Sequence, residues 1–127
     1  EKFKNNKNVK SLLCNLENEN ITESNFNLVI SSMAFHHLVN PGLVLPKIKE
    51  VTAKNGYICL IDLESEDGSF HPDPLSMGVH HFGFSKETVE KWGKNSHLSF
   101  LEYKIVHTID KNQKKYPIFL AVFKNEK

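Results

Sequence analysis

The stretch FNLVISSMAFHHL, residues 26–38, decides the fold. It opens with a mostly apolar run that is typical of a parallel strand covered on both faces. The run stops abruptly at Ser31 and Ser32, and His36 and His37 follow within a few residues. In open α/β sheets, ligands bind beyond the carboxyl ends of the strands. The stretch therefore predicts a central strand that ends at a ligand site, although no Gly-rich turn precedes it.

Length and composition narrow the class of protein. A chain of 127 residues predicts a single domain over residues 1–127. The net charge is +1 and the sequence contains no arginine, so it lacks the basic stripe that nucleic-acid binding requires. No apolar run approaches the roughly 18 residues of a membrane span. We therefore expect a soluble, cytoplasmic protein that binds neither nucleic acid nor membrane.

The two cysteines predict no redox or zinc motif. Cys14 and Cys59 lie in separate apolar runs without CxxC spacing. We expect both to be reduced, buried thiols.

Alternating element signals predict an α/β fold. Residues 8–16 (NVKSLLCNL) are apolar enough for a strand, and a polar loop or short helical turn follows them. Leu45, Ile48 and Val51 fall on one face of a helix over residues 43–53, which we expect Asn55-Gly56 to close. Residues 57–63 (YICLIDL) then form a strand. Strand, helix and strand make a right-handed βαβ unit.

The carboxyl-terminal half predicts a loop, a helix and two strands. Residues 64–83 contain Pro72 and Pro74 and form a long loop, and loops of that length are usually functional or disordered. Ser85 is a typical N-cap for a helix that runs to about residue 94. Apolar residues indicate strands over 100–109 and 117–123, joined by a polar turn and therefore antiparallel.

No short catalytic motif of independent meaning is present. A mononuclear metal site could be assembled from His37, His71 and His81 with Asp62 or Asp67, but no spacing requires it. Adjacent histidines diverge on a regular strand or helix, so each pair offers at most one good ligand. We therefore predict no metal. Asp62, at the end of its strand, is equally consistent with a loop cap and with a ligand contact.

The order of the elements and several local sequence segments together resemble the second half of a class I S-adenosylmethionine-dependent methyltransferase. The matching segments are FNLVISSMAFHHL for the family's fourth strand and its exit, AKNGYICLIDLE for the next helix-to-strand step, EDGSFH with GVHHFGFSKETVEKW beyond the fifth strand, and YKIVHTIDKNQKKYPIFLAVFKN for the terminal antiparallel pair. The resemblance implies a partial Rossmann-like sheet in the order 4-5-7-6, with an antiparallel last strand and helices on its faces.

The resemblance also implies roles for individual residues. Asn15 and Leu16 end the strand that contacts the adenine ring of the cofactor, where the family commonly has Asp. Ser31, Ser32 and Met33 then lie beside the methionine part of S-adenosylmethionine. His36, His37 and His71 are the catalytic candidates, because they are the polar groups nearest the transferred methyl; structural packing is an equal alternative for each.

The family's first two strands and its Gly-rich turn have no counterpart here. We therefore expect S-adenosylmethionine to bind weakly or not at all to this chain alone. We expect methyl transfer to a small-molecule acceptor only when that half is present. The alternative is a non-catalytic methyltransferase-like module that acts through a partner chain; a flavodoxin-like domain is a further, less favoured one. We also expect residues 8–16 to pair beside residues 26–31, to exchange with another copy or to be poorly ordered, because the fourth strand exposes an apolar edge that favours self-association.

Overall fold

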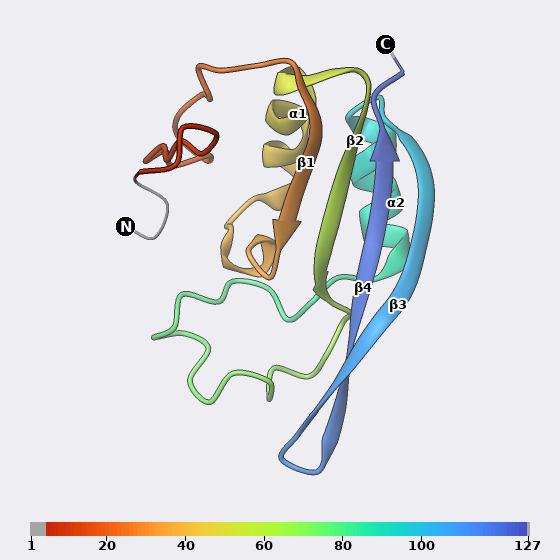
Figure 1. Cartoon of the computed structure of the whole chain (residues 1–127). Coiled ribbons are helices and arrows are strands. Elements are labelled where there is room, and N and C mark those ends of the chain that lie inside the picture. Colours follow the sequence, from red (N-terminus) through yellow and green to blue (C-terminus); the bar gives the residue numbers. More distant parts are fainter. Residues whose placement is uncertain (1–4, 127) are drawn as a thin grey trace.

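The computed structural model describes residues 5–126, which form a four-stranded sheet and two α-helices (Figure 1). The sheet order is β1-β2-β4-β3. The elements in chain order are β1 (Phe26–Ser32), the 3-10 helix η1 (Phe35–His37), α1 (Pro41–Val51), β2 (Thr52–Leu63), α2 (Lys86–Asn95), β3 (Ser99–Lys111) and β4 (Lys114–Lys124).

Sheet topology confirms the predicted α/β class and strand order. β1 and β2 are parallel, with Ile30 paired to Cys59, and α1 connects them. β4 runs antiparallel to both β2 and β3. The order expected from the resemblance, 4-5-7-6, is therefore the order of β1, β2, β4 and β3. The carboxyl ends of β1 and β2 point to the same edge of the sheet.

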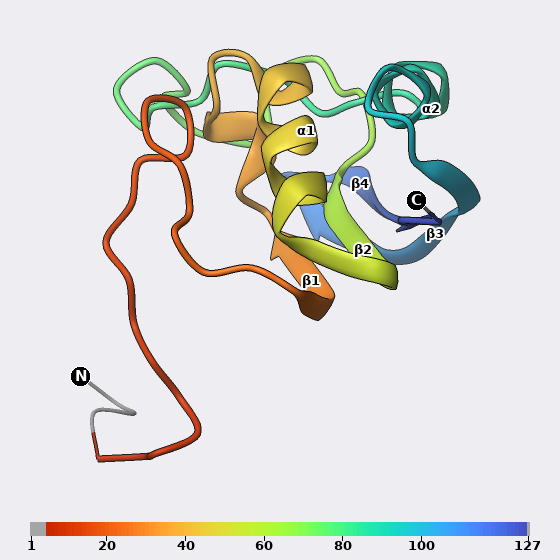
Figure 2. The same cartoon turned by 90° about the horizontal axis from the view of Figure 1, so that it is seen from above.

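Both α-helices lie on the same face of the sheet (Figure 2). The main core lies between them and the sheet and includes Leu45, Ile58, Val89 and Phe119, all essentially inaccessible. The approach of α2 to β4 is close, because a Cβ added at Gly93 would lie 2.5 Å from the Phe123 ring. The expected helices on both faces are therefore present on one face only in the described residues.

The helix between β1 and β2 differs in its ends from the prediction. α1 begins at Pro41 and ends at Val51, and Pro46 lies inside it rather than in its first turn. Thr52 is the C-cap, so Asn55-Gly56 does not close the helix. These two residues lie within β2, at the register shift of its pairing with β1, where Asn55 has a φ of 65°. A turn signal is present, but it marks an irregular strand start.

The expected strand over residues 8–16 does not form. The segment has no strand pairing, and Leu12 and Leu13 are exposed. Pairing beside β1 was therefore wrong for this chain, because β1 pairs only with β2 in the described residues. The cysteines also differ from expectation, since Cys14 and Cys59 are free but only partly buried.

Residues 64–83 form the predicted long loop, and Ser85 caps α2 by accepting a hydrogen bond from the Thr88 amide.

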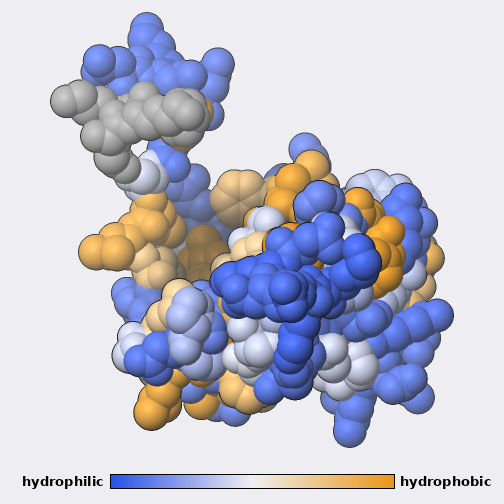
Figure 3. All heavy atoms as spheres, turned by 90° about the horizontal axis from the view of Figure 1, so that it is seen from below, coloured by the Kyte–Doolittle hydropathy of each residue, from blue (hydrophilic) through white to orange (hydrophobic). Residues whose placement is uncertain are grey.

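The turn between β3 and β4 is tighter than expected. Asn112 and Gln113 alone separate the strands, and both have positive φ. Such φ values suit a two-residue hairpin turn, in which Asn is tolerated in place of Gly. Figure 3 views the molecule from the end that carries this turn, and its surface there is largely hydrophilic. Among residues 5–126 no helix has the length and apolar character needed to cross a membrane.

Candidate functional site

Three histidines meet beyond the carboxyl ends of β1 and β2. His36 and His37 lie in η1, and His71 lies in the 64–83 loop. The ring centroids are 4.3 Å apart for His36 and His37, 5.1 Å for His36 and His71, and 6.1 Å for His37 and His71. We call these three residues the histidine cluster. The structure therefore brings together all three histidines singled out from the sequence.

Asp62, near the end of β2, orients His36. Its Oδ1 lies 2.7 Å from Nδ1 of His36, and its Oδ2 accepts a 3.2 Å hydrogen bond from the His36 amide. Both side chains are buried. Because a carboxylate accepts, Nδ1 of His36 donates, which leaves Nε2 as the free ring nitrogen. Of the two alternatives for Asp62, the structure shows a buried structural partner of His36.

His37 is oriented in the same way by a backbone carbonyl. Its Nδ1 donates to the carbonyl oxygen of Gly78 at 3.0 Å, so its Nε2 is also free. The loop that supplies Gly78 is held further by the amides of His80 and His81, which both donate to the His36 carbonyl. The backbone of η1 and the far end of the loop are thus joined.

The third histidine carries an unpartnered nitrogen. Nδ1 of His71 is buried and has no hydrogen-bond partner. Burial and then the neighbouring His36 and His37 lower the pKa of His71, which favours its neutral form. A neutral ring beside two other imidazoles, with one buried nitrogen unpaired, has a lone pair available for a metal ion.

The loop before His71 is fixed to the β3–β4 hairpin. Ser69 Oγ and the Tyr116 hydroxyl are 2.6 Å apart, and Lys111 Nζ donates to the Phe70 carbonyl. The Phe70 ring packs edge-on against Tyr116. His71 is therefore placed by the two residues that precede it, which sequence reasoning about the loop could not show.

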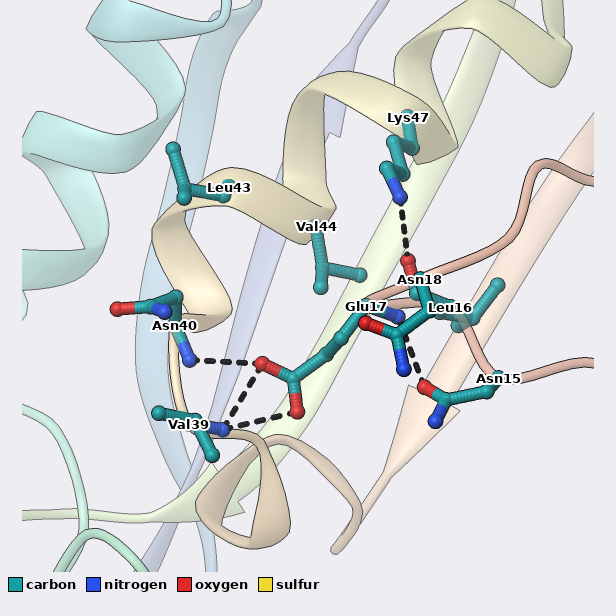
Figure 4. Close-up of a pocket in the computed structure, with 9 residues that line it drawn as sticks. All are labelled: Asn15, Leu16, Glu17, Asn18, Val39, Asn40, Leu43, Val44 and Lys47. Carbon is teal, nitrogen blue, oxygen red and sulfur yellow. Dashed lines mark hydrogen bonds between the residues drawn. The ribbon is translucent and has the colours of Figure 1, made fainter.

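A second feature is a cleft between the N-terminal segment and the start of α1 (Figure 4). It has a volume of about 320 Å³, and Asn15 and Leu16 are among the residues that line it. The remaining lining residues are Glu17, Asn18, Val39, Asn40, Leu43, Val44 and Lys47. Neither the histidine cluster nor residues 31–33 line this cleft.

Glu17 and Lys47 hold the cleft together, and no pattern in the sequence indicates either residue. The Glu17 carboxylate accepts hydrogen bonds from the amides of Val39 and Asn40 at 2.9 to 3.0 Å (Figure 4). Lys47 Nζ donates to the Leu16 carbonyl at 2.8 Å. The backbone hydrogen bonds from Asn40 and Val39 lower the pKa of Glu17. Contacts between residues more than twenty positions apart leave no local pattern in the sequence.

Ser31, Ser32 and Met33 end β1 as expected. Met33 has a φ of 55°, and its amide donates to the Ile61 carbonyl of β2 at 2.9 Å. This turn directs the chain from β1 into η1. Ser31 and Ser32 are thus the last residues of β1, and Met33 follows them on the way to the histidine cluster.

The chain is similar in sequence to known methyltransferases. Residues 1–60 match a family model described as a methyltransferase domain. An uncharacterized methyltransferase of Schizosaccharomyces pombe is 34% identical over 83 residues, which cover 61% of this chain and 29% of that protein. The chain thus spans under a third of its curated relative.

Solved structures share the fold at low identity. A Bacillus halodurans protein assigned to the methyltransferases superposes with a TM-score of 0.71 at 12% identity, covering 90% of this chain and 70% of that one. The chain carries part of the fold of an S-adenosylmethionine-dependent methyltransferase. Burkholderia thailandensis 1,6-didemethyltoxoflavin-N1-methyltransferase, solved with bound 1,6-didemethyltoxoflavin and S-adenosylhomocysteine, gives a TM-score of 0.65 at 11% identity over 90% of this chain and 49% of that one.

One residue that lines the cleft, Asn15, keeps a hydrogen-bond acceptor free for a ligand. Oδ1 of Asn15 accepts from the Glu17 amide at 3.1 Å and keeps a second lone pair, which can accept from an adenine amine. The Leu16 carbonyl is already bound by Lys47. Asn15 therefore suits an adenine edge, while nothing in residues 5–126 supplies the Gly-rich turn that cradles the cofactor in methyltransferases.

Proposed function

We propose that this chain takes part in S-adenosylmethionine-dependent methyl transfer to a small molecule, together with a segment that supplies the Gly-rich turn. The observation that carries the proposal is the convergence of His36, His37 and His71 beyond the carboxyl ends of the parallel strands β1 and β2. Ligand sites of open α/β sheets lie at that edge. The fold and the sequence relatives support the same chemistry.

The residues divide into a cofactor side and an acceptor side. Asn15 and Leu16 would hold the adenine, and Ser31, Ser32 and Met33 would lie beside the methionine part. When bound, the cofactor supplies an electrophilic methyl group on a sulfonium. The chain's own task is then to position the acceptor in line with that methyl, because correct orientation supplies much of the rate enhancement. In this proposal the histidine cluster holds the acceptor's polar group.

Cofactor binding tests the proposal. S-adenosylhomocysteine should bind the complete protein in isothermal titration, and Asn15→Ala should weaken binding about tenfold, which corresponds to one hydrogen bond. Asn15→Asp should keep full affinity, because its carboxylate also accepts from the adenine amine. Asn20→Ala, an exposed amide outside the cleft, is the control.

The 127-residue chain alone should bind S-adenosylhomocysteine weakly or not at all. Micromolar affinity for this chain would contradict the need for a further segment. Equal affinities of the Asn15→Ala variant and the unsubstituted complete protein would contradict the adenine assignment.

A non-catalytic module is the second candidate, and one observation favours it. β1 is an edge strand whose Phe26, Leu28 and Ile30 are at least 40% exposed. An exposed apolar edge is a template for pairing with another chain. The chain's role would then be association with a partner chain, and the test is whether the chain self-associates through β1.

A further inference from the structure

The histidine cluster has the composition of a metal site. One ring nitrogen of each of His36, His37 and His71 lies within 4.8 Å of one from each of the others. Nitrogens bound at about 2.1 Å to one tetrahedral zinc ion lie roughly 3.4 Å apart. Rotations that move the rings by about an ångström would therefore close the cluster around an ion.

The hydrogen bonds around the cluster leave one nitrogen of each ring free. Asp62 occupies Nδ1 of His36 and the Gly78 carbonyl occupies Nδ1 of His37, so Nε2 of each ring keeps its lone pair. Metal-bound histidines almost always donate their second nitrogen to a carboxylate or a backbone carbonyl. Nδ1 of His71 is buried without any partner, a state that a bound cation would relieve.

Burial differs among the three rings in a way that leaves one side open. His36 is buried, His71 is partly buried and His37 is exposed. Three protein ligands with an open fourth position characterise catalytic rather than structural zinc sites. The fixed loop also places His71 before any ion binds, since Ser69 and Phe70 are held by the hairpin.

We propose that His36, His37 and His71 bind one divalent transition-metal ion of the zinc class, with Asp62 as the carboxylate that orients His36. Imidazole ligands suit zinc, cobalt, nickel and copper rather than magnesium or calcium. The open position takes an oxygen, nitrogen or sulfur atom of a ligand. That this ligand is the methyl acceptor rests on the proposed function; the metal site itself does not.

Adjacent histidines argued against a metal in the sequence, because they diverge on a regular strand or helix. Here a single 3-10 turn ends at His37, and the rings of His36 and His37 come within 4.3 Å between centroids. The expected divergence was therefore wrong for these two rings. His81 is not one of the three histidines whose ring nitrogens lie within 4.8 Å of one another in the described residues.

Cobalt and zinc titrations of the 127-residue chain, without cofactor, test the site. We expect one Co²⁺ per chain with the intense visible absorption of tetrahedral cobalt, displaced by Zn²⁺. His37→Ala and His71→Ala should each weaken zinc binding at least tenfold, and Asp62→Asn should do so by about 10- to 100-fold. His107→Ala, an exposed histidine of β3, should bind as the unsubstituted chain does.

Several outcomes would overturn the site: no binding, binding that His71→Ala leaves intact, or binding that falls equally with His107→Ala. Circular dichroism establishes that each variant is folded, and His37→Gln, at an exposed position, gives a second readout of ligation.

Azide should shift the cobalt bands, because the fourth coordination position is open; unchanged bands would contradict the open position. Since no cofactor is present, a failure of methyl transfer in the complete protein leaves these results unaffected, and loss of metal binding leaves cofactor affinity unaffected.

Discussion

Asp62 is a fully buried carboxylate that serves three nitrogen donors. It accepts from Nδ1 and the amide of His36 and from the amide of Leu63. A buried donor that loses its partner costs the full desolvation of that group. The residue therefore has a structural role whether or not the cluster binds metal.

Replacing Asp62 with Ala should lower the free energy of unfolding by about 3 kcal/mol, because the buried His36 ring loses its partner. Urea unfolding monitored by circular dichroism measures the change. Asp73→Ala, an exposed carboxylate in the loop, should change stability by less than about 0.5 kcal/mol. Equal stabilities of the two variants would show that the Asp62–His36 pair contributes little.

At the scale of the element, the hydrophobic pattern predicted that both helices and β1 to β4 exist, and Ser85 predicted the start of α2. The end of α1 was missed, because Thr52 rather than Asn55-Gly56 caps it. Residues 8–16 carry a similar apolar signal but form no strand, because they pair with none of the four strands in residues 5–126. The tight Asn112-Gln113 turn was missed for a different reason. It depends on positive φ at two non-Gly residues, which the sequence does not mark.

The N-terminal segment is linked to α1 through one carboxylate. Glu17 accepts from the amides of Val39 and Asn40, next to the first turn of α1. Negative charge is favourable at a helix N-terminus, where amides are unpaired. Those hydrogen bonds lower the pKa of Glu17, first through Asn40 and then through Val39.

This link should depend on pH. A carboxyl group whose pKa is lower in the folded state stabilises the fold above its unfolded pKa of about 4.5, and the stabilisation is lost as the pH falls through the folded value. Hydrogen exchange at the Val39 and Asn40 amides should therefore be slow at pH 5 to 7 and quicken relative to other amides below about pH 4.5. Glu17→Gln should remove that dependence. Glu19→Gln is a neighbouring control, and an unchanged pH profile in Glu17→Gln would contradict the assignment.

For the molecule as a whole, the site was less predictable than the sheet. The histidines could be singled out from the sequence because their types and the resemblance pointed to them. Their common geometry could not, since it depends on Asp62, on the Gly78 carbonyl and on a loop held by Tyr116. Each of these contacts joins residues that are far apart in the sequence. They are tertiary contacts, so no local sequence pattern predicts them.

The two edges of the sheet differ in how they are protected. β3 carries charged residues along its length and two register shifts, features that discourage edge pairing. β1 (FNLVISS) has no charged residue, and Ile30 is 60% exposed. The β1 edge is therefore where this chain would meet a second copy or a partner strand.

We expect the chain to self-associate through β1 in sedimentation equilibrium, with the apparent mass rising above that of one chain as concentration increases. Ile30→Lys should keep it monomeric, because an edge lysine cannot be desolvated without cost. Ile105→Lys makes the same change on β3, at the opposite edge, and should leave association unchanged. A monomeric unsubstituted chain at all concentrations would rule out pairing through β1, and equal effects of the two lysines would show that general repulsion rather than the β1 edge sets the assembly.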